Sequence, residues 1–177
     1  MSGNTAENGP VFDANSVQAF KDAFARHAAG VAIITSRTPD GAPVGFTATS
    51  LASLSADPPR ATFNIAQTSS SWSAITVGNL VAVHFLGVEA GHIAAKFATD
   101  TANRFVGEHW VSGPYDLPIV NGNTAVLIAR VSDVILKNNN AIVVLDILEG
   151  QFAETHSPLL YYQRTFHALG EIDGDLR

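Results

Sequence analysis

The chain has 177 residues, of which 46% are hydrophobic and 15% charged, with a net charge of −6. This length fits one domain with a substantial core, and the apolar content excludes a disordered protein and indicates extra surface buried against a partner subunit. The negative charge argues against nucleic-acid binding, and the absence of cysteine excludes disulfides, thiolate catalysis and cysteine metal sites.

The first half of the chain predicts one helix and three strands. Residues 1–14 are polar and are expected to form a disordered lead. Asn15 or Ser16 is expected to cap a helix that runs to about residue 28, because Val17, Phe20 and Phe24 recur at helical spacing. A buried strand is predicted at residues 31–35 and further strands at 44–47 and 61–65, separated by turns at 38–41 and 57–59.

The second half predicts two short helices and four strands. One helix begins within residues 69–71 and the other covers residues 90–98, whereas 107–123 is predicted to be a loop. Strands are expected at residues 80–86, 125–136, 141–152 and 159–166, and Asn138, Asn139 and Asn140 suit the tip of a hairpin. Residues 171–177 are left as a tail.

This order of elements predicts a mainly β protein. Many strands with short, scattered helices argue against a doubly wound parallel sheet and favour antiparallel hairpins closing into a barrel. No internal boundary appears, so residues 15–170 are expected to form one domain. No apolar run is long enough to span a bilayer and the N-terminus has no apolar signal region, so the sequence predicts a cytoplasmic protein with no membrane contact.

Two neighbouring stretches are dense in small polar side chains. The first contains Thr47, Thr49, Ser50, Ser53 and Ser55, and the second contains Asn64, Thr68, Ser69, Ser70 and Ser71. Small donors packed so closely suit an oxyanion such as phosphate, with backbone N–H groups of a following helix contributing. The alternative is an exposed strand edge for the first stretch and a helix cap for the second, although a cap needs only one serine.

An acidic protein that binds phosphate needs a cation at the site. Lys96 is the first choice, because Phe97 beside it is placed to pack near an aromatic ligand; the alternative is a solvated charge. The same alternative applies to Arg26, Arg104, Arg130 and Arg164. Trp72 is expected to be a core or interface residue.

Several other chemistries lack their motifs. The chain contains no Gly-x-Gly-x-x-Gly after a strand, no Walker loop and no Gly-x-Ser-x-Gly, and its six histidines show no metal-ligand spacing. No metal site is therefore expected.

An ordered set of motifs resembles the flavin reductase family, over about residues 20–169. The motifs are Gly45-Phe46-Thr47-Ala48-Thr49-Ser50, Asp57-Pro58-Pro59, Asn64 with Thr68-Ser69-Ser70, Phe97-Ala98, Arg104-Phe105, Leu117-Pro118 and Pro158-Leu159-Leu160-Tyr161. The resemblance implies a Greek-key split β-barrel with a few short peripheral helices, assembled as a homodimer with its flavin near the subunit interface. It also implies an NAD(P)H-dependent FMN reductase that supplies reduced flavin to a separate monooxygenase. FMN or FAD, and NADH or NADPH, remain open.

The same resemblance implies a set of cofactor-binding residues. The ribityl chain and phosphate would be contacted by Thr47, Ala48, Thr49 and Ser50, and the isoalloxazine ring and its tail by Asn64, Ala66, Thr68, Ser69 and Ser70. The set is completed by Phe46, Lys96 and Phe97.

The chain departs from the family at one position. Where the two long strands turn, the family commonly carries Gly-Asp-His with the histidine near the nicotinamide, whereas this chain has Asn138, Asn139 and Asn140. Asn140 is the candidate nicotinamide contact, since an amide hydrogen-bonds a carboxamide but cannot move a proton, and no catalytic residue is otherwise assigned. Two alternatives stay open: a flavin-binding protein without reductase turnover, and another FMN split-barrel oxidoreductase such as a relative of pyridoxamine-phosphate oxidase. The second needs a further cationic cluster, and only 10 Lys and Arg residues are present.

Overall fold

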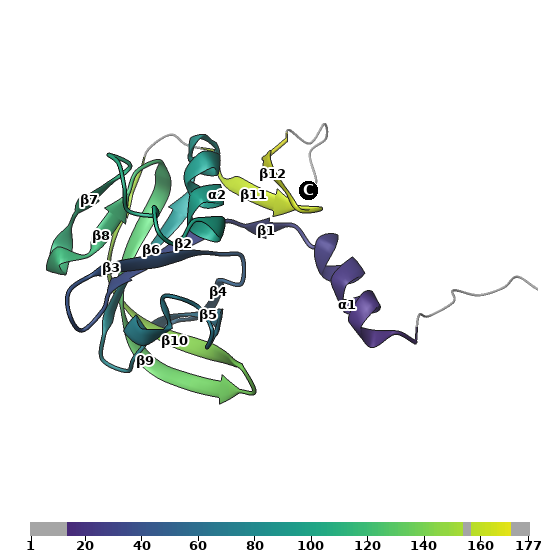
Figure 1. The fold of residues 1–177 in the computed structure, drawn as a ribbon, viewed down its shortest axis with the longest axis horizontal. Helices are drawn as coiled ribbons and strands as arrows, with labels where there is room; N and C mark the ends of the chain where they lie inside the picture. Colours follow the sequence, from purple (N-terminus) through teal and green to yellow (C-terminus); the bar gives the residue numbers. More distant parts are fainter. Residues whose placement is uncertain (1–13, 154–156, 171–177) are drawn as a thin grey trace, which may run out of the picture.

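A computed structural model describes residues 14–153 and 157–170, so the predicted lead, apart from residue 14, and the predicted tail lie outside the described residues. Its main feature is a seven-stranded antiparallel sheet (Figure 1). In spatial order the strands are β3 (Pro43–Ala48), β2 (Ala32–Arg37), β6 (Leu80–Leu86), β9 (Asn123–Lys137), β10 (Asn140–Phe152), β5 (Pro59–Ala66) and β4 (Ala52–Ala56). The hairpins β2–β3, β4–β5 and β9–β10 are joined by connections that cross other strands, as in a Greek key.

The sheet curls on itself around a cluster of buried apolar side chains. Phe46 on β3 and Phe63 on β5 lie near opposite ends of the strand order, yet their ring centroids are 5.7 Å apart. The edge strands β3 and β4 are not paired with each other within the described residues, so the barrel stays split there. The mainly β fold is confirmed, and the long predicted strands match β2, β3, β5, β6, β9 and β10.

Two predictions about short strands are wrong, and a third strand was foreseen only as an alternative. The predicted loop at 107–123 contains a small hairpin of β7 (Trp110–Ser112) and β8 (Pro118–Val120) around a 3-10 turn, η3 (Pro114–Asp116). The predicted last strand is two strands, β11 (Leu159–Tyr162) and β12 (Thr165–Ala168), which pair with each other and with β1 (Ala29–Gly30). The strand β4 was expected only in the alternative interpretation of the first polar stretch, because an edge strand that is exposed at every position has no apolar face to reveal it.

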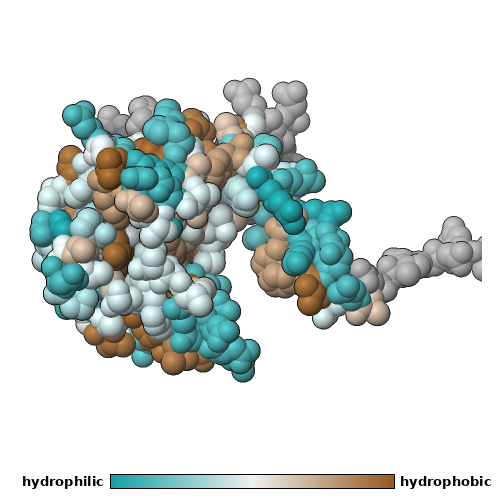
Figure 2. Space-filling model, viewed as in Figure 1, coloured by the Kyte–Doolittle hydropathy of each residue, from teal (hydrophilic) through white to brown (hydrophobic). Residues whose placement is uncertain are grey.

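The first helix, α1 (Ser16–Ala25), begins at the predicted cap, where the Asn15 side chain accepts a hydrogen bond from the Gln18 N–H at 3.2 Å. It ends three residues earlier than expected and contains no buried residue. Val17, Phe20 and Phe24 are 62%, 61% and 60% exposed. The helix stands away from the barrel, and hydrophobic colour runs along its inner side (Figures 1 and 2). Among the described residues, no helix is long and apolar enough to cross a membrane.

The second helix, α2 (Gly91–Thr99), follows a 3-10 turn, η2 (Val88–Ala90), and matches the predicted helix at 90–98. Ile93 and Phe97 bury their side chains against Val31 and Ile33 of the barrel, which fixes α2 next to β3. The helix predicted to begin within 69–71 is only a single 3-10 turn, η1 (Trp72–Ala74), and its N-cap Ser71 makes no capping hydrogen bond through its side chain. Such a short turn offers little helix dipole for an anion.

A buried histidine joins three strands beneath α2. The Nδ1 of His84 on β6 lies 3.0 Å from the Ile33 carbonyl oxygen, and its Nε2 accepts a hydrogen bond from the Val120 N–H at 3.1 Å. Because a carbonyl only accepts, Nδ1 carries the hydrogen and the ring is neutral. Burial lowers the pKa of His84 to about 4.

Candidate functional site

Parts of the two polar stretches meet in one cavity of about 360 Å³, between the end of β3, strand β5 and helix α2. Its size falls within the usual range for small-molecule sites. A hydrogen bond from the Asn64 N–H to Ser50 Oγ, at 3.0 Å, holds the two stretches together. The cavity is lined by Phe46, Thr47, Ala48, Thr49, Ser50, Asn64, Ile65, Ala66, Ser69, Phe97, Ala98 and Arg104.

Most of the predicted cofactor-binding residues therefore share one wall, but Thr68, Ser70 and Lys96 are not among the described residues that line it. Ser53 and Ser55 also lie elsewhere, on the exposed edge strand β4, as the alternative interpretation of that stretch expected. The hydroxyl cluster is thus split: residues 47–50 face the cavity, and the residues beyond them form an edge strand.

Among the described residues, the cation that lines the cavity is Arg104, whereas the first choice from the sequence was Lys96. Its Nη1 donates to the Gly45 carbonyl at 2.7 Å and to Ser70 Oγ at 3.0 Å. The residue is only 8% exposed, and its buried Nε has no hydrogen-bond partner among the described residues. Burial lowers the pKa of Arg104, while the neighbouring Asp100 opposes that shift. A positive charge that is largely buried in a cavity wall favours an anion beside it, so the part of Arg104 that lines the cavity fits a phosphate.

The ammonium group of Lys96 is bonded outside the cavity. Its Nζ donates to the Val106 carbonyl at 2.6 Å, in the loop that follows α2. The sequence carried one signal for Arg104, its place in the Arg104-Phe105 motif, but no signal for which of the two cations faces the ligand.

The apolar side of the cavity depends on close packing between β3 and α2. Phe97 is fully buried and packs edge-on against Phe105, with ring centroids 5.1 Å apart. A Cβ at Gly45 would lie 2.9 Å from the Phe97 ring and 2.9 Å from the Ile34 carbonyl oxygen, so only glycine fits there. Thr47 Oγ1 donates to the Ala94 carbonyl at 2.7 Å and ties the same strand to the helix.

The asparagine turn lies beside the cavity without lining it. Asn140 pairs with the cavity residue Ala66 in the β10–β5 ladder. Gln67 holds the turn through its backbone N–H, which donates to the Asn139 carbonyl at 2.8 Å, and its side chain, which donates to the Asn138 carbonyl at 2.7 Å. Asn138 adopts a φ of 52°, as the hairpin prediction required.

A second hollow of about 350 Å³ adjoins the first, because both are lined by Thr47, Thr49 and Ala98. On its far side are Tyr161 and Phe166, whose ring centroids are 5.5 Å apart, together with Arg164. Two aromatic rings, an arginine and threonine hydroxyls suit a nucleotide.

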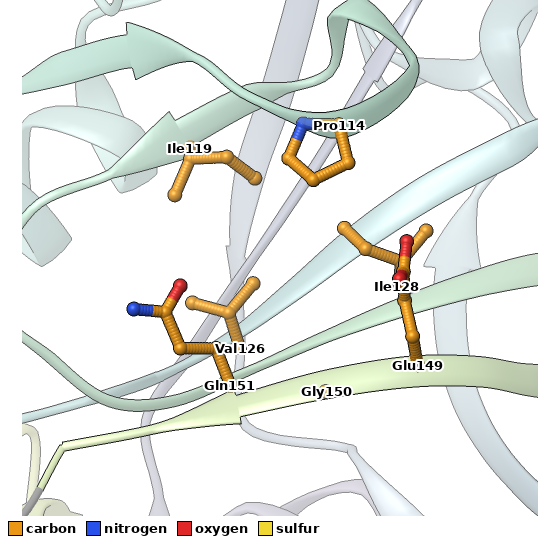
Figure 3. Close-up of a pocket in the computed structure, with 7 residues that line it drawn as sticks. All are labelled: Pro114, Ile119, Val126, Ile128, Glu149, Gly150 and Gln151. Carbon is orange, nitrogen blue, oxygen red and sulfur yellow. The ribbon is translucent and has the colours of Figure 1, made fainter.

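A third hollow has unsuitable chemistry for an anion. It measures about 200 Å³ and lies between the β7–β8 hairpin and the β9–β10 ladder (Figure 3). Ile119, Val126 and Ile128 supply apolar walls, and the charged group at its rim is the carboxylate of Glu149, which would repel a phosphate.

Comparison with known proteins relates nearly the whole chain to one family. Residues 24–170 match the family described as flavin reductase like domain. An NADH:FMN oxidoreductase from Rhodococcus qingshengii is 33% identical over 153 residues, which cover 84% of this chain and 79% of that protein. The reductase component of 4-hydroxyphenylacetate 3-monooxygenase from Pseudomonas aeruginosa is 31% identical, covering 86% and 91%. The crystal structure of a flavin reductase domain protein from Arthrobacter sp. FB24 superposes with a TM-score of 0.85 at 46% identity, covering 90% of this chain and 99% of that one.

Proposed function

The chain belongs to the flavin reductase family, and on that premise we propose that it is an NAD(P)H-dependent flavin reductase that supplies reduced flavin to a separate monooxygenase. The observation that carries the proposal is the cavity at the split of the barrel. It places the hydroxyl of Thr49 and the largely buried guanidinium of Arg104 around one space. These groups fit the phosphate of FMN.

The protein's part in the reaction is binding and orientation. When bound, the flavin would supply the hydride-accepting chemistry and a reduced nicotinamide the hydride, so no protein group would have to supply a proton for the transfer. Arg104 and the Thr49 hydroxyl would hold the phosphate, while Phe46, backed by the buried Phe97, would offer an apolar surface for the rest of the ligand. Asn64 and Ala66 on β5, with Ser69, complete the wall on which the ring is oriented.

The nicotinamide nucleotide is expected in the adjoining hollow. Arg164 supplies a positive charge for its phosphates, and Tyr161 and Phe166 supply rings for stacking. Asn140 remains the candidate contact for the carboxamide, supported by the pairing of its backbone with Ala66 at the cavity wall. The names of the relatives favour NADH as the nucleotide and FMN as the flavin.

We further propose that the protein is a homodimer acting in the cytoplasm, with transient contact to its monooxygenase. The support for the dimer is the exposed apolar face of α1. An isolated helix of this length is marginal in water, and helices of proteins gain most of their stability by burying an apolar face. A second copy of the chain would cover Val17, Phe20 and Phe24.

Purified protein mixed with FMN and NADH tests the function directly, by loss of the nicotinamide absorbance. We expect a rate of NADH oxidation well above that of a protein-free control. If no combination of NADH or NADPH with FMN or FAD is oxidised faster than in its control, the reductase proposal is refuted. Parallel assays with the four combinations decide the preferred flavin and nucleotide.

The asparagine turn favours a second candidate, a flavin-binding protein without turnover. It predicts a yellow protein that binds flavin tightly and oxidises no NAD(P)H. If the asparagine turn is the reason for the missing turnover, the variant Asn140→His would gain reductase activity. A variant with unchanged activity would mean that another part of the protein prevents turnover. The third alternative, a pyridoxamine-phosphate oxidase relative, has less support, because Arg104 is the one cation among the described residues lining the cavity. Pyridoxal-type phosphates that fail to bind in a titration would remove it.

A further inference from the structure

The loop that carries Arg104 into the cavity is held by an unusual set of hydrogen bonds. We define the Arg104 loop as residues 100–109, between α2 and β7. Three consecutive carbonyl oxygens of its backbone each lie within hydrogen-bond distance of a side-chain nitrogen. The Arg104 carbonyl lies 2.6 Å from His109 Nε2, the Phe105 carbonyl accepts from Trp110 Nε1 at 2.8 Å, and the Val106 carbonyl accepts from Lys96 Nζ at 2.6 Å.

Aromatic packing fastens the same loop to the floor of the cavity. The rings of Phe105 and His109 both meet Phe97 edge-on, with centroids 5.1 Å and 6.1 Å away, and Trp110 meets Phe105 edge-on at 5.4 Å. Because a carbonyl only accepts, Nε2 of His109 must carry a hydrogen, which it does in the Nε2–H tautomer and in the protonated ring alike. Gly107, at a φ of +116°, lets the chain turn back so that His109 reaches the Arg104 carbonyl.

These contacts fix where the Arg104 side chain starts, and its far end is fixed separately. Nη1 is held by the Gly45 carbonyl and by Ser70 Oγ, so both ends of the side chain are anchored and Nε stays in the buried wall of the cavity. A long side chain that is free to move loses rotamer entropy when it binds a ligand, and an anchored one has already lost it.

We propose that Lys96 and His109 are positioning residues for the flavin phosphate: they act through the Arg104 loop and neither touches the ligand. The proposal rests on the proposed function, since it assumes that Arg104 meets the phosphate. It changes the role expected for Lys96 from a direct phosphate contact to a clamp on the backbone two residues beyond Arg104.

A double-mutant cycle separates the two roles of Lys96. Dissociation constants for FMN and for riboflavin, which lacks the phosphate, are measured by flavin fluorescence for Lys96→Met, Arg104→Met and the double variant, with Lys21→Met on α1 as the matched control. We expect Lys96→Met to weaken FMN binding by about two- to tenfold, the range of one ordinary hydrogen bond, and to leave riboflavin binding unchanged. In the Arg104→Met background, Lys96→Met is expected to have no further effect, because its action passes through Arg104.

The cycle also has results that overturn the proposal. Independent, additive losses would mean that Lys96 contacts the phosphate itself, and equal losses for FMN and riboflavin would mean a general structural role. Lys96→Arg, which keeps a cationic donor, is expected to restore binding. A parallel pair covers the case in which Lys96→Met does not fold: His109→Gln keeps an N–H donor and should bind FMN normally, whereas His109→Leu should lose affinity for FMN alone. If the wild-type protein bound no FMN, the proposed function would fail instead.

Discussion

Acid should destabilise this protein through His84 as the pH falls below 6.5. The imidazole sits between the Ile33 carbonyl and the Val120 N–H, completely buried. A second ring hydrogen would leave the Val120 N–H without an acceptor and would place a charge in the core. That burial is why the pKa of His84 falls from 6.5 to about 4 in the folded state.

The sign and size of the effect follow from this shift. Between pH 6.5 and 4 the unfolded chain binds a proton at His84 that the folded chain does not, so stability is complete above pH 6.5 and falls as the pH falls. With about 1.4 kcal/mol per pKa unit, the loss is roughly 2 kcal/mol at pH 5 and about 3 kcal/mol once the pH is below 4. Asp40 and Asp116, whose pKa values are lowered from 3.8 by hydrogen bonds from Thr38 and Ser112, contribute stability that is lost only below that range.

Urea unfolding at pH 7 and pH 5 and at fixed protein concentration, followed by tryptophan fluorescence, measures this loss. The matched variant is His84→Gln, whose amide can donate to the Ile33 carbonyl and accept from the Val120 N–H but does not titrate. We expect the wild type to lose roughly 2 kcal/mol more than the variant between the two pH values. Equal losses in both proteins would refute the assignment of the acid sensitivity to His84.

Three further predictions concern the site and the assembly. Arg104→Met should weaken FMN binding by about ten- to a hundredfold, as expected for losing a hydrogen bond to a charged group, and should leave riboflavin binding unchanged. A fluorescence titration measures both affinities, and equal losses for the two ligands would contradict a phosphate contact. Gly45→Ala should lower the melting temperature and the flavin affinity together, because its Cβ would overlap the Phe97 ring and the Ile34 carbonyl, and an unchanged melting temperature would contradict that packing. Replacing Phe20 and Phe24 together with serine should convert a dimer into a monomer in light scattering, and an unaltered dimer would place the interface elsewhere.

The long, strongly patterned elements were predictable from the sequence. The capped helix α1, the buried strands β2 and β6, and the hairpin β9–β10 all carry apolar periodicity or turn residues that identify them locally. The short strands were harder to predict. An exposed edge at β4 was only an alternative interpretation, because that strand has no apolar face. The turn between β11 and β12 uses Gln163 and Arg164, which adopt φ values of 48° and 64° without any glycine to mark it. Those strands exist because their neighbours offer hydrogen bonds, which no local pattern records.

The sequence alone identified the family, and the comparisons confirm it. The sequence also identified the polar stretches from which a phosphate site was predicted. Side-chain chemistry and order along the chain are sufficient for that. Only the tertiary structure showed that the serines of the edge strand β4 lie apart from the hydroxyls at the cavity. It also showed that Arg104, and not Lys96, lines the cavity wall. The reason is physical: the partner of Arg104 at Gly45 is 59 residues away in the sequence, and whether a cation meets a ligand or a backbone carbonyl depends on which chain segments pack together in space.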